Sequence, residues 1–169
     1  YREAGIPMIA IDIPHPGATY YGANNYEAGL IGGRYLGRWV KEHWHSEMID
    51  EILLLELKRA GNLPRMRLSG LLVGINMILP SAANCRVTYL EGDGGLGPSF
   101  ETVRRHLRSS NARRVLVGAI NDPSALGALR AFQEAGRAEN CAVFGQNASP
   151  EGRAELRQPK TRFVGSVAY

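Results

Sequence analysis

The chain alternates short apolar runs with longer segments of helical periodicity. A loop containing Gly, Pro or Asn follows each run, and a helical pattern comes next. The apolar runs predict strands over residues 6–11, 51–57, 86–90, 114–120, 141–145 and 163–167. Because strands and helices alternate and the strands are continuously apolar, we predict a parallel sheet covered on both faces. This is the doubly wound parallel sheet of the α/β class.

The helical segments carry recognisable start and stop signals. Asn25 is predicted to cap the first helix. The inward face of this helix is expected to hold Ala28, Ile31, Tyr35, Leu36, Trp39 and Val40. Its glycines at positions 29, 32 and 33 predict close packing against the sheet. Further helices are expected after Pro64, over residues 99–107, from Asp122 to Gly136, and from Ser149 to Pro159.

The length and charge of the chain limit the number of domains and the kinds of partner that we expect. With 169 residues and a net charge of +4, the chain is expected to form one globular domain or slightly more. The densest basic run, residues 104–114, lacks interleaved aromatic residues, so we interpret it as a solvated helix face and expect no nucleic-acid partner. No apolar run reaches the roughly 18 residues of a membrane span, and no membrane insertion is expected. The chain starts at Tyr1 instead of Met, and we expect a fragment of a longer protein.

The candidate functional residues are those that follow the predicted strands. In doubly wound sheets, ligands bind outside the carboxyl ends of the strands. The polar residues at these positions are Asp12, Arg65, Arg67, Asp93, Asn121, Asp122, Gln146, Asn147 and Tyr169. Carboxylate, amide and guanidinium groups can each hold two neighbouring hydroxyls. The set therefore indicates a neutral, polyhydroxylated ligand such as a sugar.

Enzymatic and metal-binding alternatives find little support. No Ser or Cys nucleophile stands beside a His, and no phosphate loop ends in Gly-Lys-Ser or Gly-Lys-Thr, so we expect no enzyme and no cofactor. His43 and His45 are two residues apart, whereas a helix places residues three or four apart on one face, so no metal site is expected.

The segment "GDGGLG" at residues 92–97 fits the dinucleotide fingerprint G-x-G-x-x-G. However, the Asp93 carboxylate would lie where a pyrophosphate binds, and the acidic residue expected about 20 positions later is missing. We therefore set aside a nicotinamide-dependent enzyme.

Five segments together carry a family resemblance: "PMIAID", "GANNYEAGLIGG", "PRMRLSG", "GAINDPSALGALRAFQEAGR" and "VFGQN". Over essentially its whole length, the chain resembles the type I periplasmic sugar-binding proteins of bacterial ABC transporters. This family is related to ribose-binding protein and to the effector domains of LacI-type repressors. The resemblance implies two α/β lobes joined by crossing strands, with the sugar held between them. It also implies that the chain contains mainly the second lobe.

The resemblance divides the chain and assigns roles within it. Residues 1–23 would form the end of the first lobe and the hinge crossing, which passes near Ala23 and Asn24, and residues 24–169 would form the second lobe. The sugar-binding residues carried over from the family are Asp12 as acceptor, Arg67 as paired donor, Asn121 as donor and acceptor, and Asn147 where relatives often have Asp. Asp93, Gln146 and Tyr169 remain candidates by their position after strands.

The sequence departs from the family pattern at three places. Ile13 stands where ribose binders have arginine, Asn147 is uncharged, and "GDGGLG" offers no aromatic residue to stack on a sugar. The identity of the sugar therefore stays open. Simpler roles are also open: Asn121 as a turn or cap residue, Asn147 as a turn residue, and Arg67 as a surface helix charge.

The implied function is binding of a sugar in an interlobe cleft and its delivery to the permease subunits of an ABC transporter, in the periplasm or another extracytoplasmic compartment. The alternative is the effector-binding domain of a LacI-type transcription regulator, which would be cytoplasmic. A preceding signal peptide would favour the first, and a preceding helix-turn-helix the second.

The two cysteines test the predicted strand order. If the strand at 51–57 is central, with 86–90 on one side and 114–120 and 141–145 on the other, Cys85 and Cys141 lie three strands apart. Their separation would be roughly 14 Å, well beyond the limit of about 7 Å between Cα atoms in a disulfide. We therefore predict two free, mostly buried thiols.

Overall fold

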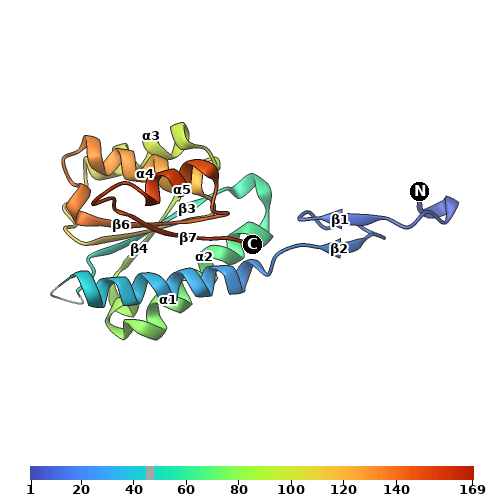
Figure 1. Ribbon diagram of the computed structural model, residues 1–169, viewed down its shortest axis with the longest axis horizontal. Helices are drawn as coiled ribbons and strands as arrows, with labels where there is room; N and C mark the ends of the chain where they lie inside the picture. The colour runs from blue at the N-terminus through green and yellow to red at the C-terminus, as the bar shows by residue number, and fades with distance from the viewer. Residues whose placement is uncertain (45–47) are drawn as a thin grey trace.

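The computed structural model describes residues 1–44 and 48–169. Within these ranges the chain forms a body around a five-stranded sheet and an arm that carries a two-stranded sheet (Figure 1). The strands of the main sheet are, in spatial order, β4 (Arg86–Glu91), β3 (Glu51–Glu56), β5 (Val115–Ala119), β6 (Cys141–Gln146) and β7 (Phe163–Val167). Neighbouring strands are parallel throughout this sheet. The predicted architecture and strand order are therefore confirmed.

Helices cover both faces of the main sheet. One face carries α1 (Asn25–His43) and α2 (Asn62–Ile78), and the other carries α3 (Leu96–Leu107) and α4 (Asp122–Glu134), with α5 (Pro150–Leu156) beside α4 and β7 (Figure 1). Short 3-10 helices lie at η1 (Arg2–Ala4), η2 (Lys58–Ala60), η3 (Pro80–Asn84) and η4 (Ala138–Asn140).

The core is divided by the sheet into two apolar clusters. Side chains of the fully buried strand β3 alternate between them: Leu53 and Leu55 face α3 and α4, whereas Ile52 and Leu54 face α1 and α2. This period of two is the geometry of an extended strand. Removing apolar surface from water on both faces is the main stabilisation of such a layered body.

The start of α1 differs from the prediction by one residue. Asn24 is the N-cap, and its Oδ1 accepts a hydrogen bond from the backbone N–H of Glu27 at 3.0 Å. Asn25, predicted as the cap, is instead the first residue of the helix and is buried. Two adjacent asparagines offer the same capping chemistry, and sequence alone did not separate them.

Most of the predicted inward face of α1 is buried, but Ile31 and Tyr35 are 49% and 42% exposed. Both line an open hollow beside Val164 and Gly165 of β7. Because β7 is the last strand on that side of the sheet, this flank of α1 extends past the sheet, and the prediction for these two residues was wrong.

The glycines of α1 pack mainly against α2, and only partly against the sheet as predicted. A Cβ on Gly29 would lie 2.0 Å from the carbonyl oxygen of Arg67, and one on Gly33 would lie 2.1 Å from that of Leu71. A Cβ on Gly32 would meet the Phe144 ring of β6. The α1 and α2 backbones therefore touch, and this contact fixes Arg67 beside the first turns of α1.

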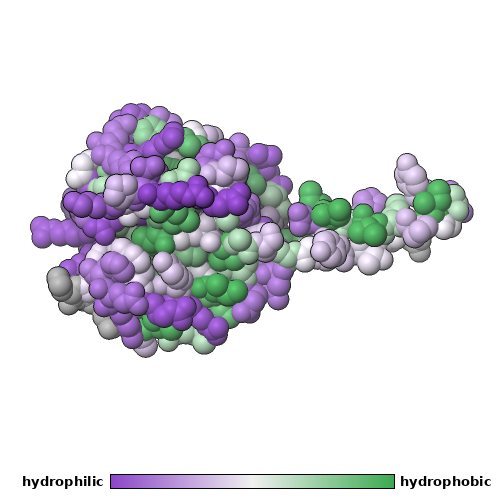
Figure 2. All heavy atoms as spheres, viewed as in Figure 1, coloured by the Kyte–Doolittle hydropathy of each residue, from purple (hydrophilic) through white to green (hydrophobic). Residues whose placement is uncertain are grey.

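The arm contains β1 (Ile9–Ile11) and β2 (Thr19–Tyr21), which pair in parallel. β1 is shorter than the strand predicted over 6–11, and β2 lies in a segment predicted as loop. Ile9, Ile11 and Tyr21 are each about 70% exposed, and the arm extends away from the body with apolar groups on its surface (Figure 2). The expected burial of the first strand is therefore not provided by the described part of the chain.

Several smaller predictions can also be compared. The helices expected from Pro64 and residue 99 begin earlier, at Asn62 and Leu96. Both cysteines are free thiols, Cys141 buried and Cys85 partly buried, as predicted. Of the two histidines considered as metal ligands, His45 lies outside the described residues. None of the helices within 1–44 and 48–169 has the length and apolarity needed to cross a membrane.

Candidate ligand-binding site

A cavity of about 660 Å³ opens where the carboxyl end of the main sheet meets the arm. Its walls come from the arm, from the crossing to α1, from α2 and from the residues after β6 and β7. The lining residues are Ile11, Asp12, Tyr21, Gly22, Ala23, Arg67, Asn147 and Tyr169. The structure thus brings together the predicted site residues Asp12, Arg67, Asn147 and Tyr169, and the predicted hinge residue Ala23.

Arg67 is the best-fixed charged group in this cavity. Its Nε donates to Asn25 Oδ1 at 2.7 Å, and its Nη1 donates to the carbonyl of Ile120 at 2.7 Å and to Asn147 Oδ1 at 3.2 Å. The guanidinium also lies 5.1 Å from the centre of the Tyr169 ring. A free surface charge would not be held from three directions, so Arg67 is an oriented group of the cavity wall.

Tyr169 completes this cluster. Its hydroxyl donates to Asn147 Oδ1 at 2.6 Å, so Asn147 accepts from both Tyr169 and Arg67. Partial burial raises the pKa of the Tyr169 phenol above its usual value, Arg67 opposes this shift, and the carboxylate of Asp12 reinforces it. The phenol therefore stays protonated and able to donate at neutral pH.

The backbone is unusual at two of these positions. Asp12 has φ 61° and Asn147 has φ 91°, both in the left-handed region that side-chain-bearing residues rarely adopt. Such conformations cost of the order of 1–3 kcal/mol each and cluster at ligand-binding and switch sites. Asn147 is held in place by its backbone N–H, which donates to the carbonyl of Val167 at 2.8 Å.

Three predicted site residues, Asn121, Asp93 and Gln146, do not line the cavity. Asn121 caps α4: its Oδ1 accepts from the N–H of Ser124 at 2.9 Å, and its Nδ2 donates to the carbonyl of Gly94 at 2.9 Å. Asp93 forms an exposed ion pair with Arg59 at 2.6 Å. In this structure Asn121 has the simpler capping role, and both of its polar atoms are used within the protein.

Gln146 is buried, with a side-chain amide that is unpaired within the described part of the chain. Its side chain is fully buried at the end of β6, one residue before Asn147. Among the described residues, neither its Oε1 nor its Nε2 has a hydrogen-bond partner. An unpaired buried amide is costly, and Gln146 does not line the cavity.

Asp122 holds together three elements near the site. Its buried carboxylate accepts from the N–H of Ser149 and from the hydroxyl of Ser166, each at 2.6 Å. Burial raises the pKa of Asp122, and these two hydrogen bonds oppose the shift. The contacts join the starts of α4 and α5 to β7, so Asp122 has a structural role.

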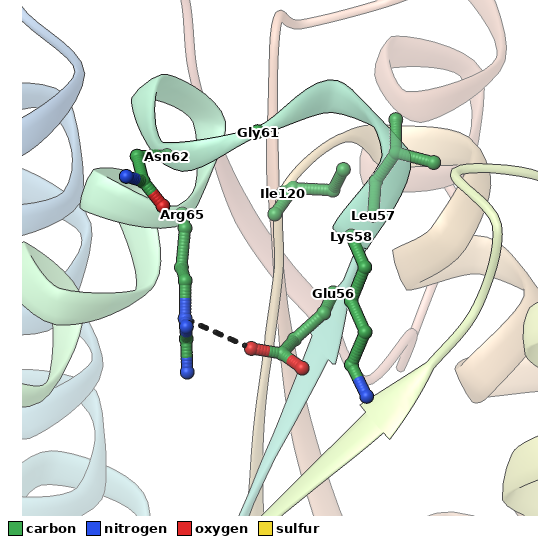
Figure 3. Close-up of a pocket in the computed structure, with 7 residues that line it drawn as sticks. All are labelled: Glu56, Leu57, Lys58, Gly61, Asn62, Arg65 and Ile120. Atoms are coloured by element: carbon green, nitrogen blue, oxygen red, sulfur yellow. Dashed lines mark ion pairs between the residues drawn. The ribbon is translucent and has the colours of Figure 1, made fainter.

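A second, smaller cavity of about 120 Å³ lies between the ends of β3 and β5 and the start of α2 (Figure 3). Glu56 faces Arg65 across it, with Glu56 Oε1 3.1 Å from Arg65 Nε (Figure 3). Ile120 joins the two cavities, because its side chain lines the small one while its carbonyl accepts from Arg67. The arginines of residues 65–67 therefore serve different cavities.

Sequence reasoning missed part of the wall. The sequence does not indicate Tyr21 and Gly22, because the run "TYY" is short, although its β-branched and aromatic residues favour a strand. The sequence predicts Asn25 only as a cap, because its contact with Arg67 spans 42 positions and no local pattern reveals it. In the described ranges, no group of three or more His, Cys, Asp or Glu side chains could hold a metal ion.

A cavity with charged and amide side chains at the carboxyl edge of a doubly wound sheet, where the chain passes from the arm into α1, is typical of ligand-binding proteins of the α/β class. The family profile of the periplasmic binding protein domain matches residues 1–167. The chain therefore belongs to the periplasmic binding protein domain family, and the family recognised from the sequence is confirmed. Among curated proteins, no sequence matches significantly.

Solved structures of similar fold include transport proteins and a regulator. An ABC transporter solute-binding protein from Agrobacterium vitis with bound allitol has a TM-score of 0.78 at 19% identity, covering 99% of this chain and 57% of that one. One from Actinobacillus succinogenes with bound D-allose gives 0.77 at 19%, covering 93% and 55%. A LacI family transcriptional regulator from Enterococcus faecium with bound ribose gives 0.71 at 18%, covering 99% and 57%. The chain spans about half the length of these structures.

Proposed function

We propose that this chain supplies the second lobe and the hinge crossing of a solute-binding protein that binds a sugar and delivers it to the permease subunits of an ABC transporter. Residues 1–23 would end the first lobe and cross the hinge at Ala23 and Asn24, and residues 24–169 would form the second lobe. The observation that supports this most directly is the cavity in which Asp12, Arg67 and Asn147 meet from distant parts of the chain.

The side chains suit a neutral polyol. Asp12 offers acceptor oxygens, Arg67 offers donors in a fixed plane, and Asn147 and Tyr169 add polar groups beside an aromatic ring. A sugar that touches both the arm side and the body side of the cavity favours the state in which the two sides are closest. Closure about the crossing would then present the loaded form to the transporter.

The proposed role is binding without chemical change of the sugar. Such a protein would work outside the cytoplasm, where it can meet both the solute and the transporter. The family membership and the sugar-bound transport proteins of similar fold support this compartment.

The second candidate is the effector domain of a LacI-type transcription regulator. The ribose-bound Enterococcus faecium regulator has a similar fold and supports this reading. The same cavity would then control DNA binding in the cytoplasm. The complete reading frame separates the two candidates, since an export signal favours transport and a helix-turn-helix favours regulation.

The test of the proposal is calorimetry against a panel of pentoses and hexoses. The 169-residue chain and the product of its complete reading frame are compared under the same conditions. We expect the complete product to bind one or more sugars and the 169-residue chain to bind them much more weakly, because the proposed first lobe would supply the other side of the cleft. Equal affinities would contradict the two-lobe proposal, and no binding by either protein would contradict sugar binding.

A further inference from the structure

Asn25 makes two contacts that join the cavity to the chain crossing. It is 8% exposed and lies in the first turn of α1. Its Oδ1 accepts from Arg67 Nε at 2.7 Å, and its Nδ2 donates to the carbonyl of Ala23 at 3.3 Å. A single side-chain amide therefore connects the charged group of the site to the backbone of the crossing.

The neighbouring Asn24 shows that these contacts are not those of a helix cap. Asn24 already accepts from the N–H of Glu27, which is the capping bond of α1. Asn25 has the same side chain one position later, yet it faces the body interior and bonds to α2. The two residues thus separate helix capping from the contact with Arg67.

We infer that Asn25 is a positioning residue, which orients Arg67 and couples its orientation to the crossing at Ala23. A primary amide is planar, so turning its carbonyl toward Arg67 determines where its N–H groups point. A shift of the crossing moves the amide, and the amide moves Arg67. The effect on sugar binding rests on the function proposed above, whereas the coupling itself does not.

The first experiment needs no sugar. Hydrogen exchange of the peptide covering residues 20–25 is measured in the product of the complete reading frame and in Asn25→Ala, Arg67→Ala and the double variant. We expect each single change to raise exchange severalfold by a similar factor, and the double variant to add nothing further. If exchange of the 20–25 peptide rises in Asn25→Ala but not in Arg67→Ala, the coupling is contradicted.

Asn24→Ala is the matched control. It removes the cap of α1 and is expected to lower the melting temperature, as a purely structural change would. Its effect on the same peptide should add to that of Arg67→Ala. If the effects of Asn25→Ala and Arg67→Ala on the exchange of this peptide also add, Asn25 acts only on helix stability, and the inference is wrong.

The second experiment measures sugar affinity by calorimetry. Asn25→Ala is expected to weaken binding at least about tenfold, the scale of one hydrogen bond to a charged group. In the Arg67→Ala background it should have no further effect. Asn25→Asp keeps the acceptor for Arg67 but loses the donor to Ala23, so it should restore most of the affinity while exchange at 20–25 stays high.

The outcomes separate this inference from the proposed function. Absence of sugar binding by the parent protein contradicts the function, and the exchange measurements still decide the coupling. Sugar binding that Asn25→Ala leaves unchanged contradicts the positioning role alone. Asn25→Asp with the same affinity loss as Asn25→Ala also contradicts it, because the acceptor for Arg67 would then be irrelevant.

Discussion

Glu51 is a fully buried carboxylate at the opposite end of the sheet from the cavity. It accepts from Thr88 Oγ1 at 2.6 Å and Ser110 Oγ at 3.0 Å, and it pairs with Arg86 at 2.8 Å and His106 at 3.1 Å. Burial alone raises its pKa, but the hydrogen bonds from Arg86, Thr88 and His106 outweigh burial and hold the pKa at about 2. The carboxylate is therefore a fixed structural charge.

This group predicts a pH-dependent stability. Because the folded pKa of about 2 is below the ordinary value of 4.5, ionised Glu51 stabilises the fold above pH 4.5. About 3 kcal/mol of that stabilisation should be lost as the pH falls from 4.5 to 2. Denaturant unfolding across this window measures it. Glu51→Gln should flatten this part of the profile, whereas exposed Glu101→Gln should not, and parallel profiles for Glu51→Gln and the parent would contradict the assignment.

Arg67 carries the main affinity prediction. In the product of the complete reading frame, Arg67→Ala should cost at least about 1–3 kcal/mol of sugar binding, because polar partners are left unpaired. Arg59→Ala is the control, since Arg59 forms an exposed ion pair with Asp93 and neither residue lines the cavity. Titration calorimetry that finds the same affinity for Arg67→Ala and the parent would remove Arg67 from the site.

Asn121→Ala is expected to lower both the sugar affinity and the stability of the fold. The sequence predicts a loss of sugar affinity of about 1–3 kcal/mol for Asn121→Ala. The contacts with Ser124 and Gly94 add a loss of about 0.5–2 kcal/mol of stability from the missing cap. Measuring unfolding and affinity on the same variant distinguishes the roles, and a change in stability alone would assign Asn121 to the fold.

At the scale of elements, the contact of α1 with α2 holds the cavity wall. Gly33→Ala would place a Cβ 2.1 Å from the carbonyl oxygen of Leu71, and overpacking of this kind costs about 1–3 kcal/mol or more. Gly97→Ala in α3 is the matched control, because its Cβ would meet nothing within 4 Å. It should be neutral or stabilise by up to about 1 kcal/mol. Chemical denaturation of both variants tests the prediction, and equal stabilities would disprove the close approach of the helices.

The position of the two cysteines at the starts of β4 and β6 predicts how reactive their thiols are. Burial raises the pKa of Cys141 to about 12, with Arg137 opposing, and burial also raises that of Cys85. Both thiols should therefore react slowly in the native protein at neutral pH, Cys141 more slowly than Cys85. In denaturant without reductant, titration should find both. A disulfide within one molecule would be incompatible with the observed strand order.

The elements also show what sequence can predict. The order of the main strands followed from alternating apolar runs and the rules of parallel sheets, because both are local or topological. Exposure of Ile31 and Tyr35 depends on where the sheet ends, and sequence periodicity has no information on that. At the site, the strand-end rule located Asp12, Arg67 and Asn147, but the direction of a side chain depends on distant partners.

At the scale of the whole molecule, the arm is the least protected part. The backbone amides of β1 and β2 should exchange much faster than those of β3 and β5 in the 169-residue chain, because buried strands open only with the core. Exposed apolar strands also promote association, so sedimentation should show self-association that rises with concentration. Slow exchange throughout the arm would show that β1 and β2 are already covered in this chain.

The chain enters the body through residues 22–24, and this crossing borders the same cavity as Arg67. If the protein closes about this crossing as proposed, each atom moves in proportion to its distance from the rotation axis. Groups close to that axis would shift the least. The 19-residue helix α1 leads about 28 Å away from the crossing, so its far end would sweep the widest arc. A fluorophore or spin label that tests the proposed closure on sugar binding therefore belongs near Lys41, where a small rotation at the cavity becomes a large displacement.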